Sequence, residues 1–172
     1  MRIISGKWSG RHLTSPPDKR VRPTAEDVRD VWLRMVQPYL AGARVVDLFA
    51  GSGALGLEAI SRGAKYADFV ETRPTSLHSL KANIAALHAR ERTRIFKKDA
   101  LAFASGIEPG AYQVAFADPP YGSHMLDHLI EIWEETHFSQ ILTVEHALDH
   151  EIPLGRRLIF ESSAVTIYGA QP

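Results

Sequence analysis

Acidic residues stand at the ends of several apolar segments, where they could form a charged binding site. Four such segments close on a carboxylate and a fifth follows later in the chain, at Asp47, Glu71, Asp99 and Asp118, with Glu145 as the fifth. If these segments are strands of one open parallel sheet, their ends meet at a single edge, where such sheets bind ligands. Like charges gathered there repel one another unless a ligand or hydrogen bonds offset the cost. The pattern therefore predicts a ligand site at that edge.

A glycine-rich segment follows the first of these acids. Gly51, Gly53 and Gly56 form a G-x-G-x-x-G pattern, and Glu71 stands twenty residues after Gly51. Glycine permits a tight turn and a close approach of ligand to backbone, in dinucleotide sites and in methyl-donor sites alike. Asp47 precedes Gly51 by four residues, where it would repel a pyrophosphate and attract a ligand with an ammonium and a sulfonium group. The spacing therefore favours a methyl donor.

The fourth acid opens the tetrapeptide Asp118-Pro119-Pro120-Tyr121. The two prolines have fixed φ angles and no N–H, so the segment is rigid and offers acceptors without backbone donors. Such a site suits a planar NH2 group, because the Asp118 carboxylate and the Pro119 carbonyl can each accept one amine hydrogen and turn the nitrogen lone pair towards an incoming methyl. Tyr121 can stack on the ring that carries the amine. We therefore predict that these four residues, Asp118, Pro119, Pro120 and Tyr121, form the catalytic site.

Alternating strands and helices would position these residues. The expected strands are 45–46, 69–70, 95–96, 114–117, 141–144, 158–160 and 164–168, and the expected helices are 54–62, 75–89, 100–105 and 125–136, with an earlier helix from Thr24 to Pro38. This alternation predicts an α/β fold, a three-layer Rossmann-like arrangement with a mostly parallel seven-stranded sheet. A short link that contains Ser162 and Ser163 separates the last two strands in a predicted hairpin, so one strand must run antiparallel.

The N-terminal segment differs from the rest in charge. The whole chain carries twenty basic and twenty acidic residues, but residues 1–22 hold six basic side chains and one acidic one. Apolar–polar alternation from Ile3 to Arg11 predicts a small hairpin, followed by a loop through Pro16 and Pro17. We expect a basic N-terminal hairpin or arm at residues 1–23, attached to a domain at residues 24–172.

Together these segments resemble a known family. Residues 47–59 with 118–121 are similar to class I S-adenosylmethionine-dependent amino-methyltransferases. Residues 2–6, 10–11, 22–24 and 28–30 narrow the resemblance to the RsmD family, which methylates the N2 amine of one guanine in small-subunit (16S) ribosomal RNA. Two segments depart from the family's pattern, Leu33-Arg34 and Glu161-Ser162-Ser163.

The resemblance implies a role for each part of the predicted site. The glycine loop and Asp47 would surround the methionine part of the cofactor, Glu71 would bind its ribose, and Asp99 with Ala100 its adenine. The full set implied to bind S-adenosylmethionine is Arg22, Thr24, Asp47, Phe49, Ala50, Gly51, Ser52, Gly53, Glu71, Thr72, Asp99, Ala100 and Asp118.

The resemblance also implies an RNA partner, 16S rRNA within the small ribosomal subunit or an assembly intermediate, for a protein that acts as a monomer in the cytoplasm. Basic side chains of the arm would bind RNA phosphates, and these are Arg2, Lys7, Arg11, Lys19 and Arg20. A guanine in structured RNA would first be unstacked, at a cost of about a few kcal/mol.

Several chemistries are excluded or not expected. The chain has no cysteine, which excludes disulfides, thiolate metal sites and methylation of pyrimidine C5 through a cysteine adduct. The pairs His124/His128 and His146/His150 lack the Glu of H-E-x-x-H, so no metal site is expected. The apolar stretch around residues 45–60 is broken by Asp47 and three glycines, so no membrane span is expected, and the first eight residues do not resemble a signal peptide.

Three alternatives remain at this stage. The glycine loop also fits a nicotinamide-binding oxidoreductase, and the tetrapeptide also fits methylation of adenine N6 in DNA or of a protein amide. An RNA-binding or assembly factor that has lost catalysis would keep the basic arm. Against DNA, 172 residues leave no room for a separate target-recognition domain, so specificity should come from a large preformed substrate.

Overall fold

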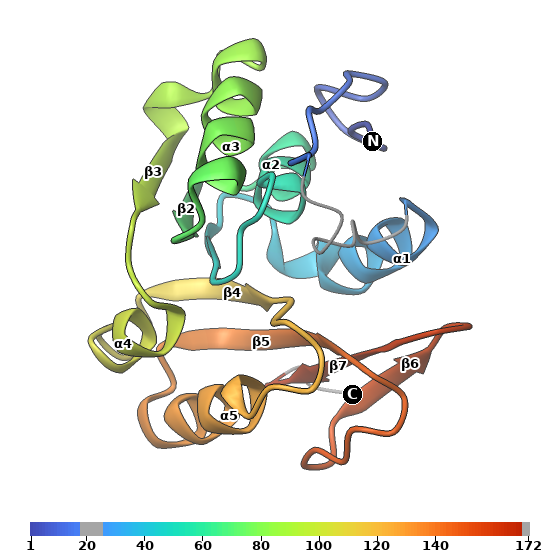
Figure 1. Ribbon diagram of the computed structural model, residues 1–172, viewed down its shortest axis with the longest axis vertical. Helices are drawn as coiled ribbons and strands as arrows, with labels where there is room; N and C mark the ends of the chain where they lie inside the picture. Colours follow the sequence, from blue (N-terminus) through green and yellow to red (C-terminus); the bar gives the residue numbers. More distant parts are fainter. Residues whose placement is uncertain (18–25, 170–172) are drawn as a thin grey trace.

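The computed structural model describes residues 1–17 and 26–169, which form a seven-stranded sheet between two layers of helices (Figure 1). The strand order is β3-β2-β1-β4-β5-β7-β6, and neighbours are parallel except where β7 pairs with β5 and β6. The strands are β1 (Arg44–Asp47), β2 (Tyr66–Val70), β3 (Thr93–Phe96), β4 (Tyr112–Ala117), β5 (Ser139–His146), β6 (Arg156–Ile159) and β7 (Ala164–Tyr168). The predicted fold class, including the single antiparallel strand, is confirmed.

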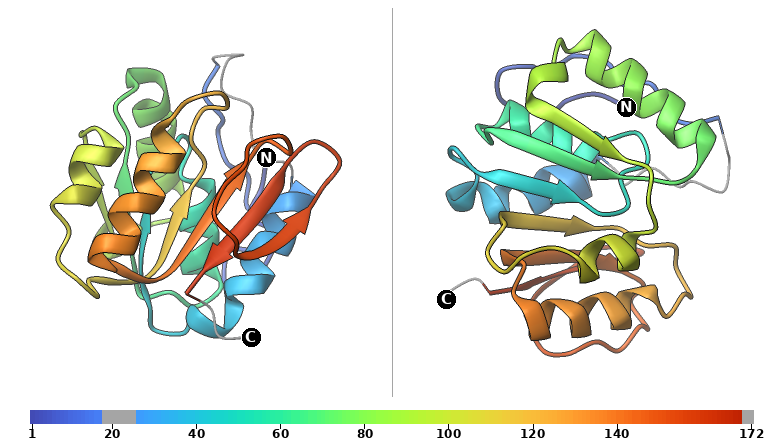
Figure 2. Two further views of the ribbon diagram at one scale, coloured as in Figure 1. Left: turned by 90° about the horizontal axis from the view of Figure 1, so that it is seen from below. Right: turned by 90° about the vertical axis from the view of Figure 1, so that its left-hand side faces the viewer.

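Helices cover both faces of the sheet (Figure 2). The first three helices pack on one face, α1 (Glu26–Val36), α2 (Ala54–Ser61) and α3 (Pro74–Ala86), and the other face carries α4 (Ala100–Ser105) and α5 (Met125–Thr136). Two short 3-10 turns, η1 (Gln37–Tyr39) and η2 (Arg90–Arg92), follow α1 and precede β3. Strands alternate inward residues between the two faces, so Val45 belongs to one apolar cluster and Val46 to the other.

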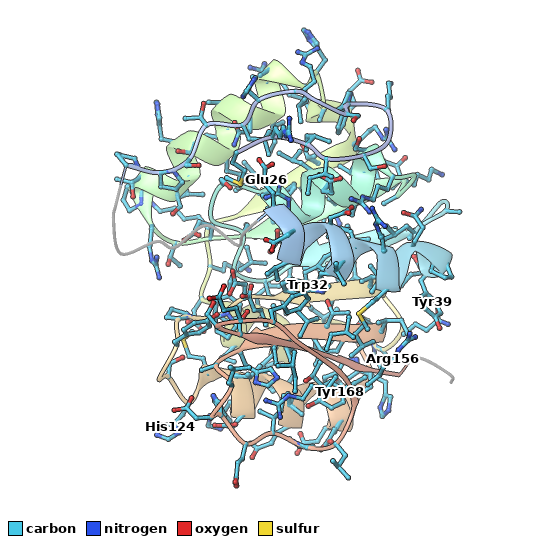
Figure 3. All side chains as sticks on the ribbon, turned by 90° about the vertical axis from the view of Figure 1, so that its right-hand side faces the viewer. Glu26, Trp32, Tyr39, His124, Arg156 and Tyr168 are labelled. Atoms are coloured by element: carbon cyan, nitrogen blue, oxygen red, sulfur yellow. The ribbon has the colours of Figure 1, made fainter. Side chains whose placement is uncertain are left out.

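Helix α1 shows how the sequence pattern builds this core. Val28, Trp32 and Val36 recur at helical spacing and are buried, and Trp32 is fully buried on the sheet side of the helix (Figure 3). The Trp32 ring meets Phe116 of β4 edge-on, with ring centroids 6.0 Å apart. The expected start of this helix at Thr24 lies outside the described residues.

Helix α3 ends three residues earlier than the predicted 75–89. His88 has a left-handed backbone, with φ of 52°. The N–H of Ala89 donates to the carbonyl of Ile84, and the N–H of His88 donates to that of Ala85, which is the hydrogen-bond pair of a Schellman C-cap. Because histidine is an unusual residue at this position, the apolar pattern alone overestimates the length of the helix.

The N-terminal segment packs against the body of the protein. Ile3, Trp8 and Leu13 are buried in the same apolar cluster as α1, α2 and α3. The predicted hairpin is present only as an isolated antiparallel bridge between Arg2 and His12, with a tight turn between them. The segment is held by α2, because the buried Glu58 carboxylate accepts the N–H groups of Ile4 at 2.8 Å and Ser5 at 2.9 Å.

Candidate active site

A cavity of about 530 Å³ opens at the carboxyl edge of the sheet. It lies where the strand order reverses between β1 and β4, the position at which open α/β sheets bind ligands. The segments after five strands line it and bring together all the acidic strand ends that the sequence singles out, Asp47, Glu71, Asp99, Asp118 and Glu145. Figure 3 shows this edge at the side of His124, where α5 begins, whereas Tyr39 and Arg156 lie at the opposite edge.

Asp47 is the most enclosed of these acids, with an exposed fraction of 1%. One oxygen, Oδ2, accepts the N–H of Gly56 at 3.3 Å, while Oδ1 is buried without a hydrogen-bond partner. Burial raises the pKa of the Asp47 carboxyl to about 7, and the negative charge of Glu71 adds to the rise. A buried acceptor in this state lacks the partner that a cationic ligand would provide.

The three glycines of the loop have different tasks. Gly51 has a φ of 54° and open space where a Cβ would lie, and it lines the cavity. Gly53 has a φ of 82° and a Cβ there would lie 2.4 Å from Leu80, so side-chain packing as well as backbone conformation requires glycine. Gly56 lets α2 approach Phe69 of β2. The sequence pattern therefore combines a ligand-facing turn with helix–strand packing.

Glu71 is fixed by backbone donors. Its Oε2 accepts the N–H of Gly51 at 2.9 Å, and its Oε1 accepts those of Thr72 and Arg73, both at 2.8 Å. The carboxylate thus ties the end of β2 to the glycine loop. Since a carboxylate accepts about four hydrogen bonds, these three leave room for a ligand hydroxyl.

Asp99 and Ala100 form the next part of the cavity wall. Asp99 is the N-cap of α4, and its Oδ1 accepts the N–H of Ala102 at 2.9 Å. Its side chain is exposed, whereas Ala100 is buried at the beginning of the helix. Phe49, Ala50 and Ser52 of the glycine loop line the same cavity.

The tetrapeptide after β4 forms the other half of the cavity. Asp118 is half-buried, Pro119 is buried, and Tyr121 has 47% of its surface exposed. The Tyr121 hydroxyl nevertheless points inward and donates to Oε1 of Glu145 at 3.1 Å. Burial of that hydroxyl and the negative charges of Glu145 and Asp118 raise the pKa of Tyr121 to about 12. The ring therefore presents a surface for stacking, while its hydroxyl stays protonated.

Of the predicted RNA-binding residues, the three that the structure describes, Arg2, Lys7 and Arg11, do not line the cavity. The guanidinium of Arg2 pairs with Glu26 at 3.2 Å, and that of Arg11 donates to the carbonyl of Ala86 at the end of α3. Lys7 is exposed, and its backbone N–H donates to Ser61 at the end of α2. Met1, Ser15 and Pro16 line the cavity instead. Lys19, Arg20, Arg22 and Thr24 lie outside the described residues.

Two departures from the family pattern have different positions. Leu33 is buried in the core and Arg34 pairs with Asp30 at 2.6 Å, and neither lines the cavity. Ser162 and Ser163, by contrast, line it beside Glu145.

Sequence reasoning named Glu145 only as a fifth acid and Ser163 only as part of a departure from the family pattern, and it did not foresee Asn83. Asn83 is a buried α3 residue whose amide donates to the carbonyls of Thr14 and Ser52, both at 2.9 Å, and whose Oδ1 accepts the N–H of Thr14 at 2.7 Å. Asn83 stands three residues after Leu80 and four before Leu87, on the apolar face of the helix, and a polar residue at that spacing is the signal that could have identified it.

The two histidine pairs differ, because only the rings of His146 and His150 meet, edge-on with centroids 6.4 Å apart. His124 and His128 are exposed, His146 is buried beside Thr166, and His150 contacts Asp127 at 2.9 Å. Within residues 1–17 and 26–169, no group of three or more metal-ligating side chains comes together. None of the described helices is long and apolar enough to span a membrane.

Comparison with known proteins places the chain in a family. The family described as "Conserved hypothetical protein 95" matches residues 1–159. Ribosomal RNA small subunit methyltransferase D of Escherichia coli K12 is 33% identical over 157 residues, which are 89% of this chain and 78% of that protein. The protein of the same name from Haemophilus influenzae is also 33% identical, over 134 residues that cover 77% of this chain and 69% of that protein.

Solved structures agree with this placement. A hypothetical protein of Thermus thermophilus superposes with a TM-score of 0.83 at 27% identity, with 99% of each chain covered. An RNA methyltransferase of Salinibacter ruber, in complex with S-adenosyl-L-homocysteine, has a TM-score of 0.67 at 14% identity and covers 86% of this chain and 92% of its own, so it shares the fold. The family match over residues 1–159 and the 33% identity to the Escherichia coli methyltransferase show that the chain belongs to the RsmD family of class I methyltransferases.

Proposed function

We propose that this protein transfers a methyl group from S-adenosylmethionine to the N2 amine of a guanine in 16S rRNA. The observation that carries the proposal is that the Asp118–Tyr121 tetrapeptide lines the same cavity as Asp47, a buried carboxyl whose Oδ1 has no hydrogen-bond partner. The relatives called ribosomal RNA small subunit methyltransferase D support an rRNA substrate.

The residues of the cavity suit S-adenosylmethionine. The unpaired Oδ1 of Asp47 would accept the cofactor's ammonium, and the open space beside Gly51 would admit its methionine part. Glu71 and Thr72 would hold the ribose, and Asp99 with Ala100 the adenine. We propose the same binding role for Phe49, Ala50, Ser52 and Gly53 of the loop, and for Arg22 and Thr24, which lie outside the described residues. When bound, the cofactor supplies an activated methyl group.

The tetrapeptide would prepare the amine. The Asp118 carboxylate and the carbonyl of Pro119 would each accept one amine hydrogen, which turns the nitrogen lone pair out of conjugation with the ring. Positive charge develops on the nitrogen as the new bond forms, and the adjacent carboxylates stabilise it. The methyl–sulfur bond would break as the new bond forms, which leaves S-adenosylhomocysteine as the other product. The amine becomes acidic only at that stage, so its proton can leave late and Asp118 need not be a strong base. Tyr121 would stack on the base.

We further propose that residues 1–23 serve as a basic arm for the domain at residues 24–172, and that Arg2, Lys7, Arg11, Lys19 and Arg20 bind rRNA phosphates. Lys7 and Arg11 lie at the far ends of α2 and α3 from the cavity. An RNA bound both there and in the cavity must be large, which favours 16S rRNA within a small ribosomal subunit or an assembly intermediate. One copy of the chain supplies every proposed group, so we propose a monomer.

Methylation in vitro tests the proposal. Small ribosomal subunits from cells that lack this protein are incubated with the protein and radiolabelled S-adenosylmethionine, and the RNA is digested to nucleosides. We expect one labelled product, N2-methylguanosine, in 16S rRNA. Label in N6-methyladenosine, or binding of NADH without binding of S-adenosylhomocysteine, would contradict the proposal.

A further inference from the structure

Glu145 stands beside Asp118 at the carboxyl edge of the sheet. Ala117 of β4 pairs with Val144 of β5 in parallel register, so the next residue of each strand is Asp118 and Glu145, respectively. Neighbouring strands lie about 4.8 Å apart, and laterally paired residues point to the same face. Both carboxylates line the cavity. The sheet therefore presents two acidic side chains next to each other where the target base is proposed to bind.

The second carboxylate is held in place rather than free to move. Glu145 is 6% exposed, and its Oε1 accepts the Tyr121 hydroxyl at 3.1 Å. Tyr121 thus joins the proposed stacking surface to this acid. Because a carboxylate accepts about four hydrogen bonds, the contact with Tyr121 is compatible with a further bond to a base.

Two neighbouring acceptors suit the edge of only one common base. Guanine carries the N2 amine next to N1–H, so its edge offers hydrogen-bond donors side by side. Adenine and cytosine carry an amine next to a ring nitrogen that has a lone pair and no hydrogen. A buried carboxylate oxygen that faces that ring nitrogen would meet another acceptor in place of a donor, which is costly. A second acidic side chain next to the amine-binding one therefore selects guanine.

We propose that Glu145 is the residue that determines base specificity, and that it accepts the N1–H of the guanine whose N2 amine is held by Asp118. The inference rests on the proposed function and adds to it the residue that distinguishes guanine from other bases that carry an amine. Tyr121 is a positioning residue for this contact, since its hydroxyl orients the Glu145 carboxylate.

A base analogue tests the inference. 2-Aminopurine keeps the amine at position 2 but has a lone pair at N1 and no O6. Small subunits are reconstituted with 16S rRNA that carries either guanine or 2-aminopurine at the methylated nucleotide, and kcat/KM is measured for both. We expect the wild-type protein to prefer guanine by about tenfold or more, the factor expected of one hydrogen bond to a charged acceptor.

The variants Glu145→Gln and Glu145→Ala should reduce that ratio by about tenfold, because the lost contact exists only with guanine. The glutamine amide can accept the N1–H of guanine through its oxygen or donate to the N1 lone pair of 2-aminopurine through its nitrogen, so Glu145→Gln should lower the ratio to about that of Glu145→Ala. Each ratio is taken on one protein preparation, which cancels any difference in the folded fraction, and the comparison between variants cancels the effect of O6.

Glu135→Gln is the matched control, because Glu135 is an exposed residue of α5 outside the cavity. It should keep the wild-type ratio. Variants of Glu145 that methylate guanine with an unchanged ratio would overturn the role of Glu145 and leave the proposed function standing. A wild-type protein that modifies neither base would contradict both proposals.

Discussion

Asp118 and Asp47 occupy one cavity but have environments suited to different tasks. Asp118 is half-buried beside two prolines, where it can meet a substrate, whereas Asp47 is enclosed behind the glycine loop with one oxygen unpaired. We assign the amine of the base to Asp118 and the ammonium of the cofactor to Asp47. These assignments predict different consequences for substitution of the two residues.

Replacement of Asp118 should affect turnover far more than cofactor binding. Asp118→Ala removes an acceptor that acts on the reacting amine, so kcat should fall by about a hundredfold to a thousandfold. The affinity for S-adenosylhomocysteine, measured by calorimetry, should change by less than about threefold. Asp118→Asn keeps one acceptor, so its kcat should lie between those of the wild type and Asp118→Ala. Equal losses of turnover and affinity would mean that Asp118 belongs to the cofactor site.

Asp47 should make cofactor binding depend on pH. Its pKa is raised to about 7 in the empty protein, and an ammonium favours the ionised carboxyl, so binding of S-adenosylhomocysteine should strengthen as pH rises from about 6 to 8 and release a proton. The raised pKa also means that this group stabilises the empty fold most below the ordinary pKa of Asp and progressively less as pH rises towards 7.

Calorimetry in buffers of different ionisation enthalpy measures that proton release. Asp47→Asn has no proton to lose at this position, so it should bind more weakly and with a flatter pH profile. A pH profile that is the same in the wild type and in Asp47→Asn would show that another group controls binding.

At the scale of elements, the cavity depends on contacts between segments that are far apart in the chain. Asn83 of α3 bonds to Thr14 of the N-terminal segment and to Ser52 of the glycine loop. Glu58 and Ser61 of α2 hold residues 4, 5 and 8 of the same segment. The N-terminal segment is therefore held by α2 and α3, and α3 also holds the glycine loop.

Loss of the Asn83 side chain should loosen both segments together. Asn83→Ala leaves the backbone groups of Thr14 and the buried carbonyl of Ser52 without these partners, so the free energy of unfolding should fall by about 1–3 kcal/mol and the affinity for S-adenosylhomocysteine should fall with it. Denaturant unfolding and calorimetry measure the two effects. His78→Ala, an exposed position on α3, should change stability by less than about 0.5 kcal/mol. If Asn83→Ala keeps the wild-type affinity for S-adenosylhomocysteine, the contact between Asn83 and Ser52 does not support the binding conformation of the glycine loop.

Local pattern predicts most of these elements, but not their long-range partners. The alternation of strands and helices and the short link at Ser162-Ser163 suffice for the fold class, and four acids at strand ends suffice to locate the cavity. The role of Glu145 could be recognised only from the register of β4 and β5, because that register places Glu145 next to Asp118. Asn83 bonds to residues 31 and 69 positions away, and periodicity within one helix contains no information about such contacts.

At the scale of the whole molecule, charge is divided between an N-terminal segment with a basic excess and a body with an acidic one. Arg2, Lys7 and Arg11 are all exposed, and Arg2 and Arg11 also have partners within the protein. The segment is thus docked by its apolar residues and directs cations outward, which suits contact with a large, preformed RNA.

Neutralisation of Arg2, Lys7 and Arg11 together should weaken binding to small subunits and flatten its salt dependence, with a loss of about 0.7–0.9 in the logarithmic slope for each phosphate contact removed. Filter binding at several salt concentrations measures the slope. A variant that neutralises Arg44, Lys65 and Arg156 removes the same charge outside the arm and should keep the wild-type slope. If the two variants have the same slope, the arm has no special role.

Nucleoside mass spectrometry of 16S rRNA from cells that lack this protein tests the central claim most directly. We predict that one N2-methylguanosine disappears, that the wild-type gene restores it, and that the Asp118→Ala gene does not. An unchanged set of methylated guanosines in the deletion strain, or restoration by Asp118→Ala, would contradict the account.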